Sequence, residues 1–387
     1  MTKYQIPSEH YYRIHHVRPR FKNNVEEVLL FIASNLTPLE PGNKPDFIKN
    51  FDTVLKMFPG NLTKTKKTIA NWRTEISSLF GFLVELSNGS MYAGNNATVL
   101  SEKQDIVEFF KYFLYTFQYP GGHMKPHETA KMIEQGIKFR PASYILNLLV
   151  IGKKITGSEF SIDKAETTHC IFNDLRVTTQ KIKIEDVANQ IIENRKKNVD
   201  YDWDGDVIRY AGDILDYMTS ANLIEKHGSN YYLNKTEKLA IDFFINHQTW
   251  FEGFDVLYDK KTNLTDIKKI SSLWYLYVNS YAGKIKFETD LLDFIGIDKA
   301  SYKQLLSKSQ QTISTSVSGA IPQLLGTHSA PKTKIIGDAG EALVHGHECM
   351  ILKKAKKNEL IPKVVILPNH LAMGYDIRSF DIKSNIK

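Results

Sequence analysis

The stretch TKKTIANWRTEISSLF, residues 65–80, has the spacing of an amphipathic helix. Its apolar side chains share one face: Ile69, Trp72, Ile76, Leu79 and Phe80. On the other side, positions 67, 71 and 74 stand at i, i+4 and i+7, so their side chains point the same way. The pattern predicts a helix that packs its apolar face on a domain and turns Lys67, Asn71 and Thr74 outward.

Two further helices are predicted before this stretch, and a hairpin after it. Helical spacing begins near Val25 and returns over residues 47–57. Strand-like residues 82–85 and 90–93 flank Asn88-Gly89, a dipeptide typical of tight hairpin turns. Three helices followed by a β-hairpin is the order of a winged helix-turn-helix, so we expect that fold here.

A second unit of the same kind is predicted further along the chain, where residues 207–221 are amphipathic and residues 223–233 alternate as strand, turn and strand. We therefore expect a mainly α protein of the α+β class, with two winged-helix subdomains, a helical linking subdomain and a partial α/β domain. The expected boundaries are 1–105 for the N-terminal arm and first winged-helix subdomain, 106–200 for the linking subdomain, 201–306 for the second winged-helix subdomain and following helices, 307–334 for a linker, and 335–387 for the last domain.

Composition narrows the class of protein. The chain has 387 residues, a formal net charge of +7 and a sequence pI of about 9.0, and a basic balance favours a polyanionic partner. Cys170 and Cys349 lie far apart and offer neither a disulfide framework nor zinc spacing, which fits a reducing cytoplasm. No apolar run approaches the roughly 20 residues that span a bilayer. We expect a cytoplasmic protein without a membrane segment.

The outer face of the helix predicted at residues 65–80 carries residue types that can form hydrogen bonds with the bases of DNA. Arginine or lysine can pair with guanine, and asparagine with adenine, in the major groove. Besides the outward residues, Lys66 and Arg73 add positive charge. The alternative is an ordinary solvated helix face, on which lysines and threonines are common.

The N-terminal arm combines cations with aromatic rings. Such arms enter a minor groove or follow phosphates. The alternative is a disordered chain end. The predicted contacts are Arg13, Arg18, Arg20 and Lys22.

Two carboxylates near the C-terminus suit a magnesium site. Glu341 stands in a segment that opens a predicted helix, and Asp376 follows a buried-strand run at residues 364–367. Carboxylates on a helix and a neighbouring strand can converge on an oxygen-lined Mg²⁺ site. The alternative is a capped helix and an aspartate at the end of a strand.

The motif Gly-Asp-Ala-Gly-Glu at residues 337–341, followed by Gly-Tyr-Asp-Ile at 374–377, resembles the front of a PD-(D/E)xK nuclease domain. The resemblance implies that Glu341 and Asp376 are catalytic carboxylates that bind Mg²⁺. Asp381-Ile382-Lys383 has the letters of the missing motif but follows Asp376 too closely to form a new strand. We therefore expect the Glu-x-Lys strand beyond Lys387, and a chain that binds DNA without cutting it.

Several blocks resemble the recognition region of the BpuJI family of modular type II, IIS-like restriction endonucleases. These blocks are residues 65–76, 109–111, 117–122, 139–141 with 144–146, and 191–195. The resemblance implies two winged-helix subdomains that grip a short asymmetric site in double-stranded DNA. It adds Lys138 and Arg140 to the predicted DNA-binding residues.

The family also implies a cognate methyltransferase in the same system. We expect the chain as given to be a monomer and leave open a dimer of a longer protein. The alternative function is a winged-helix transcription regulator or defence DNA sensor whose C-terminal module is not catalytic.

Overall fold

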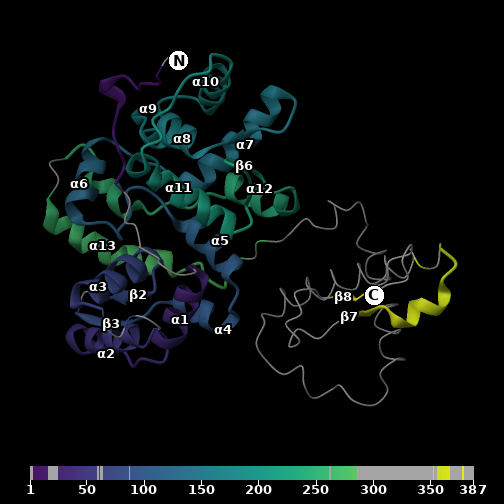
Figure 1. Cartoon of the computed structure of the whole chain (residues 1–387). Coiled ribbons are helices and arrows are strands. Elements are labelled where there is room, and N and C mark those ends of the chain that lie inside the picture. The colour runs from purple at the N-terminus through teal and green to yellow at the C-terminus, as the bar shows by residue number, and fades with distance from the viewer. Residues whose placement is uncertain are drawn as a thin grey trace. The chain divides into compact units, whose positions relative to one another are not determined.

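The computed structural model describes residues 3–15, 25–58, 61, 64–86, 88–260, 263–285, 287, 352, 355–366 and 377–378. The chain divides into two compact units, Met1–Asp290 and Leu291–Lys387. The described part is mostly helical with small antiparallel sheets, as expected for the α+β class. Figure 1 shows the elements in chain order.

The first subdomain, residues 25–93, contains the predicted helices and hairpin. Its sheet has the order β1-β3-β2, with both pairs antiparallel. The turn after the third helix uses Gly81 at φ 67°, a left-handed conformation that glycine adopts without strain. The elements are α1 (Val25–Leu36), β1 (Gly42–Asn43), α2 (Lys44–Met57), α3 (Lys66–Asn71), η2 (Trp72–Ser77), β2 (Leu83–Glu85) and β3 (Ser90–Ala93).

The helix predicted over residues 65–80 changes its winding partway. It is α-helical in α3 and π-helical in η2. Two contacts with α2 and the chain after it hold the π-helical turn: the ring of Trp72 lies 5.3 Å from that of Phe58, and Arg73 forms an ion pair with Asp52. π-Helical turns inside α-helices occur frequently at functional sites.

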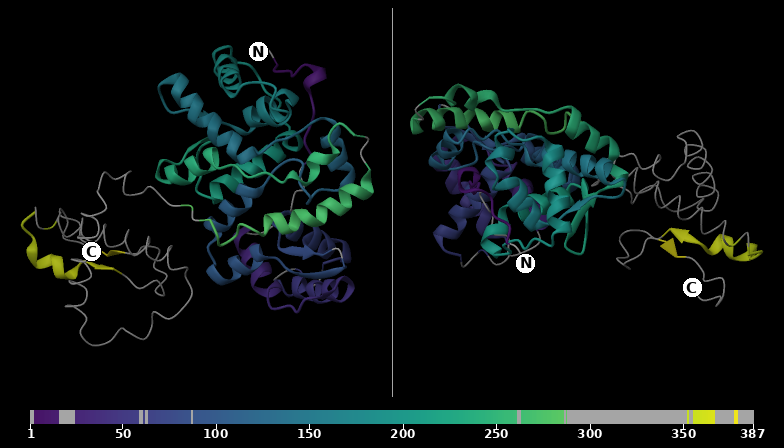
Figure 2. Two further views of the ribbon diagram at one scale, coloured as in Figure 1. Left: turned by 180° about the vertical axis from the view of Figure 1, so that it is seen from behind. Right: turned by 90° about the horizontal axis from the view of Figure 1, so that it is seen from above.

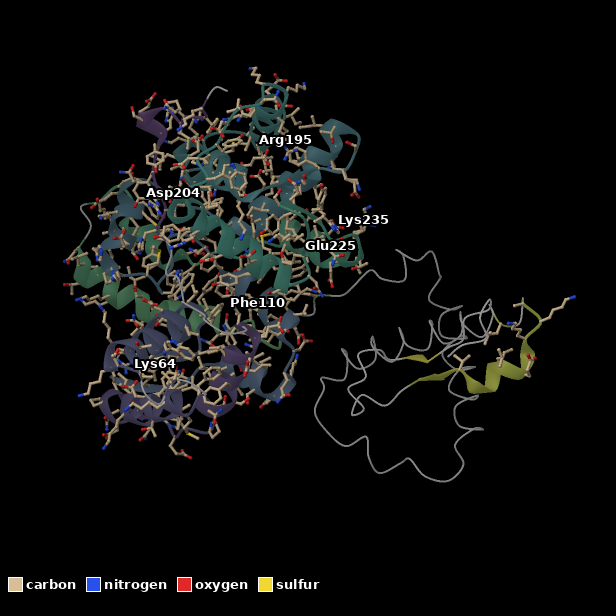
Figure 3. The ribbon with its side chains drawn as sticks, viewed as in Figure 1. Lys64, Phe110, Arg195, Asp204, Glu225 and Lys235 are labelled. Carbon is tan, nitrogen blue, oxygen red and sulfur yellow. The ribbon has the colours of Figure 1, made fainter. Side chains whose placement is uncertain are left out.

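Helices from the middle of the chain join the first subdomain to the second. They are α4 (Asn95–Lys103), α5 (Ile106–Thr116), α6 (Pro126–Glu134) and α7 (Pro141–Thr156). On α5, the ring of Phe110 lies 6.0 Å from Phe80 of the first subdomain and stacks at 5.5 Å on Tyr217 of the second. Figure 3 shows Phe110 in this central position, between Lys64 and Asp204. One continuous aromatic core therefore fixes the two subdomains to each other.

The second subdomain, residues 161–233, has a sheet with the matching order β4-β6-β5. Strand β4 comes from inside the range expected for the linking subdomain and pairs with β6, so that segment also belongs to the second sheet. The elements are β4 (Ser161–Ile162), α8 (Lys164–Thr167), η3 (Thr168–Phe172), α9 (Leu175–Thr178), α10 (Ile184–Lys196), α11 (Gly205–Ser220), β5 (Ile224–His227) and β6 (Asn230–Leu233).

The chain then forms η4 (Lys235–Glu237), α12 (Lys238–Asn246), η5 (Glu252–Leu257) and α13 (Leu264–Val278). Helix α13 packs against β2 and α6 and crosses the molecule next to the first subdomain (Figure 2). Just beyond α13, the side-chain amide of Asn279 donates to Gly81 O at 3.0 Å, and its oxygen accepts from Asn96 N at 2.8 Å. These bonds anchor the turn that follows η2.

In the C-terminal unit, the described elements are η6 (Asn358–Lys363), β7 (Val365–Ile366) and β8 (Ile377–Arg378). Strands β7 and β8 pair antiparallel, with Val365 opposite Arg378. Both strands lie where the sequence predicts strands. The linker expected at 307–334 and the helix expected from residue 337 lie outside the described residues, as do Glu341 and Asp376.

Candidate nucleic-acid interface

The outer face of α3–η2 is polar and exposed. Thr65 caps the start of α3, since its hydroxyl accepts a hydrogen bond from Thr68 N at 3.3 Å. Ile69 and Ile76 are buried on the inner side. Four of the predicted residues are exposed on the outer side: Lys66, Lys67, Asn71 and Thr74. Within the described part of the chain, neither lysine makes an ion pair and the Asn71 side chain has no hydrogen-bond partner.

Thr74 differs from its neighbours because its hydroxyl already donates a hydrogen bond within the protein. Its Oγ1 donates to Ala70 O at 2.8 Å. In π-helical winding, backbone amides reach back five residues rather than four. The Thr74 hydroxyl therefore gives the Ala70 carbonyl, four residues back, a hydrogen-bond donor. The Thr74 oxygen keeps only acceptor capacity toward a ligand.

Arg73 is directed inward. Its guanidinium forms the ion pair with Asp52 of α2, and its side chain is only 17% exposed. The structure therefore uses Arg73 to hold η2 against α2, and its charge is already compensated. Arg73 therefore does not fit the predicted role of a DNA contact.

Residues 3–15 of the N-terminal arm pack on the second subdomain. Tyr4 N donates to Asp200 O at 2.8 Å, and Tyr12 N donates to Asn173 O at 3.0 Å. Ile14 is buried, and the guanidinium of Arg13 lies over the Tyr210 ring of α11 at 5.1 Å. These residues are thus not a disordered chain end. The remaining predicted arm cations, Arg18, Arg20 and Lys22, lie outside the described residues.

Lys138 and Arg140 are engaged within the protein. Lys138 pairs with Asp255 at 3.0 Å, and its ammonium lies 4.4 Å from the centre of the Tyr258 ring. Arg140 is only 8% exposed; it donates to Tyr115 O and stacks on the ring of that tyrosine. Burial lowers the pKa of Arg140. A guanidinium at this depth cannot touch a duplex unless the core rearranges, so Arg140 does not fit the predicted role.

Helix α11 precedes the β5–β6 hairpin of the second subdomain, as α3–η2 precedes the β2–β3 hairpin of the first, but α11 is more enclosed. It packs between α5 and α8, and Asp216 on its outer side pairs with Lys164 at 3.0 Å and accepts from the Tyr231 hydroxyl at 3.0 Å. Its exposed positions lie mainly near its start, where Arg209 is found. Of these two helices, α3–η2 is therefore the one whose exposed face combines basic and amide side chains suited to base recognition.

Two further properties of the described residues bear on the site. None of their helices is both long and apolar enough to cross a membrane. They also contain no group of three or more His, Cys, Asp or Glu side chains arranged to hold a metal ion. The carboxylates predicted to bind Mg²⁺, Glu341 and Asp376, are outside this part of the chain.

Comparison with known proteins identifies the family. The family described as restriction endonuclease BpuJI, N-terminal, matches residues 4–275. The fold is similar to the binding domain of the BpuJ1 endonuclease, solved in complex with pyrene- and phenanthrene-modified DNA, with a TM-score of 0.61 and 25% sequence identity over 71% of this chain and 100% of that domain. No curated protein matches the sequence. The resemblance predicted from the sequence is confirmed for the recognition region, and the chain belongs to the family of BpuJI restriction-endonuclease N-terminal domains.

Proposed function

We propose that this protein recognises a specific sequence in double-stranded DNA as the recognition part of a restriction endonuclease, and that α3–η2 enters the major groove. The observation that carries the proposal is the exposed polar face of α3–η2 in a chain of the BpuJI N-terminal family. The similar domain of known structure was solved in complex with DNA. A net charge of +7 adds an attraction to phosphates that does not depend on base sequence.

The order of the elements supports a winged helix in each subdomain. In the first, the order is α1, β1, α2, α3–η2 and the β2–β3 hairpin, with β1 paired to the last strand. In the second, α7, β4, α8–η3, α11 and the β5–β6 hairpin follow the same order, with α9 and α10 inserted. A helix-turn-helix unit places its second helix in the major groove. In the first subdomain that helix is α3–η2.

The side chains on this face differ in hydrogen-bond capacity, so each suits a different base. The Lys67 ammonium can only donate, which suits the O6 and N7 acceptors of guanine. The Asn71 amide both donates and accepts, and so can form two bonds with adenine. Because the Thr74 hydroxyl donates its hydrogen bond to Ala70 O, its oxygen is left to accept a hydrogen bond from an amino group of cytosine or adenine.

Contacts to phosphates would come from residues at the edges of this face. Lys66 stands in the first turn of α3, beside the base-reading residues. The arm cations Arg13, Arg18, Arg20 and Lys22 would add attraction along the backbone and would make affinity depend on salt.

Hydrolysis of DNA by Mg²⁺ bound at Glu341 and Asp376 stays a prediction from the sequence, because both residues lie outside the described part of the chain. Carboxylate oxygens suit that ion. A cognate methyltransferase that protects the recognised site also stays a prediction.

The experiment that tests recognition is a selection from a library of duplexes with a randomised central segment. We expect the protein to enrich one short sequence and to bind it about 10³-fold or more tightly than random DNA at physiological salt. The enriched duplex then serves as the probe for the variants below. A protein that enriches no sequence, while binding all duplexes with one salt-dependent affinity, would refute site-specific recognition.

A further inference from the structure

A cluster of positive and protonatable side chains lies where the arm passes the start of α6. His15 packs edge-on against Tyr210 of α11, with ring centroids 5.6 Å apart. Lys125 and His127 at the start of α6 are exposed, and their charges act on His15. Figure 1 shows the arm descending beside α6 and α11. We call His15, Lys125 and His127 the α6 patch.

The acidic group nearest to the α6 patch is partly covered and already paired. Glu128 accepts from His127 Nε2 at 2.9 Å and lies 3.8 Å from the ammonium of Lys131. Its side chain is 17% exposed, against 53% for His127 and 58% for Lys131. An approaching anion would therefore meet the nitrogen atoms before the carboxylate.

The position of the α6 patch links it to the proposed DNA interface. His15 is followed in the chain by Arg18, Arg20 and Lys22, the arm residues predicted to contact phosphates. On the other side of His15, Arg13 lies on the same tyrosine ring as His15 itself. A duplex that follows the arm would bring its backbone toward this cluster.

We propose that the α6 patch binds a phosphate of the DNA backbone outside the base-reading helix, and that the His15 imidazole takes up a proton when it does. The proposal rests on the proposed function, since it assumes that the protein binds duplex DNA. It predicts an electrostatic contribution to DNA affinity that increases as the pH falls. The Lys125 ammonium would add a second electrostatic contribution to the same phosphate contact.

The direction of this linkage follows from the surroundings of His15. Burial lowers the pKa of His15, with Lys125, Arg13 and His127 acting in the same direction and Glu128 opposing them. A bound phosphate adds negative charge and favours the protonated imidazole. The pKa of His15 would thus be higher in the complex than in the free protein, so binding takes up protons and tightens as the pH falls.

The test compares the salt dependence of DNA affinity at two pH values. Fluorescence anisotropy with the selected duplex gives log affinity against log NaCl concentration at about pH 6 and about pH 8 for the full chain. Each extra cation on a phosphate steepens this slope by about 0.9. We expect the wild-type slope to be steeper by about one at the lower pH. The double variant His15→Gln/His127→Gln, which removes both imidazoles of the patch, should give the same slope at both pH values.

Two further variants make the outcome specific. Lys125→Gln should reduce the slope by about one at both pH values and keep the difference between them. His247→Gln is the matched control, because His247 is also exposed and also packs on an aromatic ring, that of Phe243 at 4.9 Å; it should behave as the wild type. Equal wild-type slopes at the two pH values, or a pH difference that survives in the double variant, would overturn the proposal. Absence of site-specific binding at both pH values would instead overturn the proposed function.

Discussion

Replacing Asn71 by alanine separates base recognition from folding and from general attraction to DNA. In the free protein the Asn71 side chain is exposed and, within the described residues, has no hydrogen-bond partner. Alanine has a higher helix propensity than asparagine by up to about 0.7 kcal/mol. The free energy of unfolding should therefore stay the same or rise slightly. Any loss of DNA affinity can then be attributed to the interface.

The magnitude follows from the bonds that an asparagine makes with adenine. A bidentate pair is worth about 1–3 kcal/mol of discrimination against the wrong base. Every 1.4 kcal/mol is about a tenfold change in an equilibrium constant. We expect Asn71→Ala to weaken binding to the selected duplex by about 5-fold to 150-fold. Binding to random DNA should change much less.

The assay is competition anisotropy with the selected duplex and a scrambled duplex of the same composition. Asn189→Ala is the matched control, because Asn189 is likewise exposed within a helix, α10, away from α3–η2. Thermal unfolding of all three proteins verifies that folding is unchanged. Equal losses on both duplexes would make Asn71 a phosphate contact, and no loss on either would remove α3–η2 from the interface.

Three further predictions concern the arm, the core and the predicted nuclease. Neutralising the arm cations by substitution with glutamine should flatten the slope of log DNA affinity against log salt concentration by up to about 0.9 per residue. Substitution is preferable to deletion of the arm, because deletion would also remove the buried Ile14 and destabilise the fold. An unchanged slope would show that the arm makes no phosphate contact. The residues to substitute are Arg18, Arg20 and Lys22. Lys111→Met should cost about 3–5 kcal/mol in urea unfolding, because it breaks a buried ion pair in which the ammonium lies 2.7 Å from the Glu237 carboxylate, itself 6% exposed. Adding Glu237→Leu in the same protein should recover much of that loss, whereas a cost below about 1 kcal/mol, as for a surface pair, would contradict this. In a protein that cleaves DNA with Mg²⁺, Asp376→Ala should abolish cleavage and leave affinity unchanged, and retained cleavage would show that Asp376 is not a metal ligand.

Local patterns were sufficient to predict the main elements of the two subdomains. The helical spacing at residues 65–80 and the Asn88-Gly89 turn each depend on residues close together in sequence. The same holds for α11 and the β5–β6 hairpin, which lie within one or two residues of the predicted ranges. Lys67, Asn71 and Thr74 are exposed as predicted because helical periodicity alone determines which residues oppose the apolar face.

The short strands β1 and β4 could not be predicted in this way. Each has two residues, too few for an alternating pattern, and each exists because a distant strand offers backbone partners. Gly42 pairs with Met91, and Ser161 with Tyr232. Similarly, the π-helical winding of η2 depends on the packing of Trp72 and the ion pair of Arg73 with Asp52. None of these interactions is visible within the segment itself.

The sequence by itself determined the fold class, the exposed polar face of the helix at residues 65–80 and the family, because periodicity and the order of the blocks are properties of the chain. Only the tertiary structure decided what each cation does. Arg140 and Lys67 are both basic residues in predicted DNA-binding segments, yet Arg140 is buried on Tyr115 while Lys67 is exposed. The same holds for the α6 patch, in which His15 is far in sequence from Lys125 and His127. Burial and proximity depend on how helices pack, and packing joins residues that are separated in sequence.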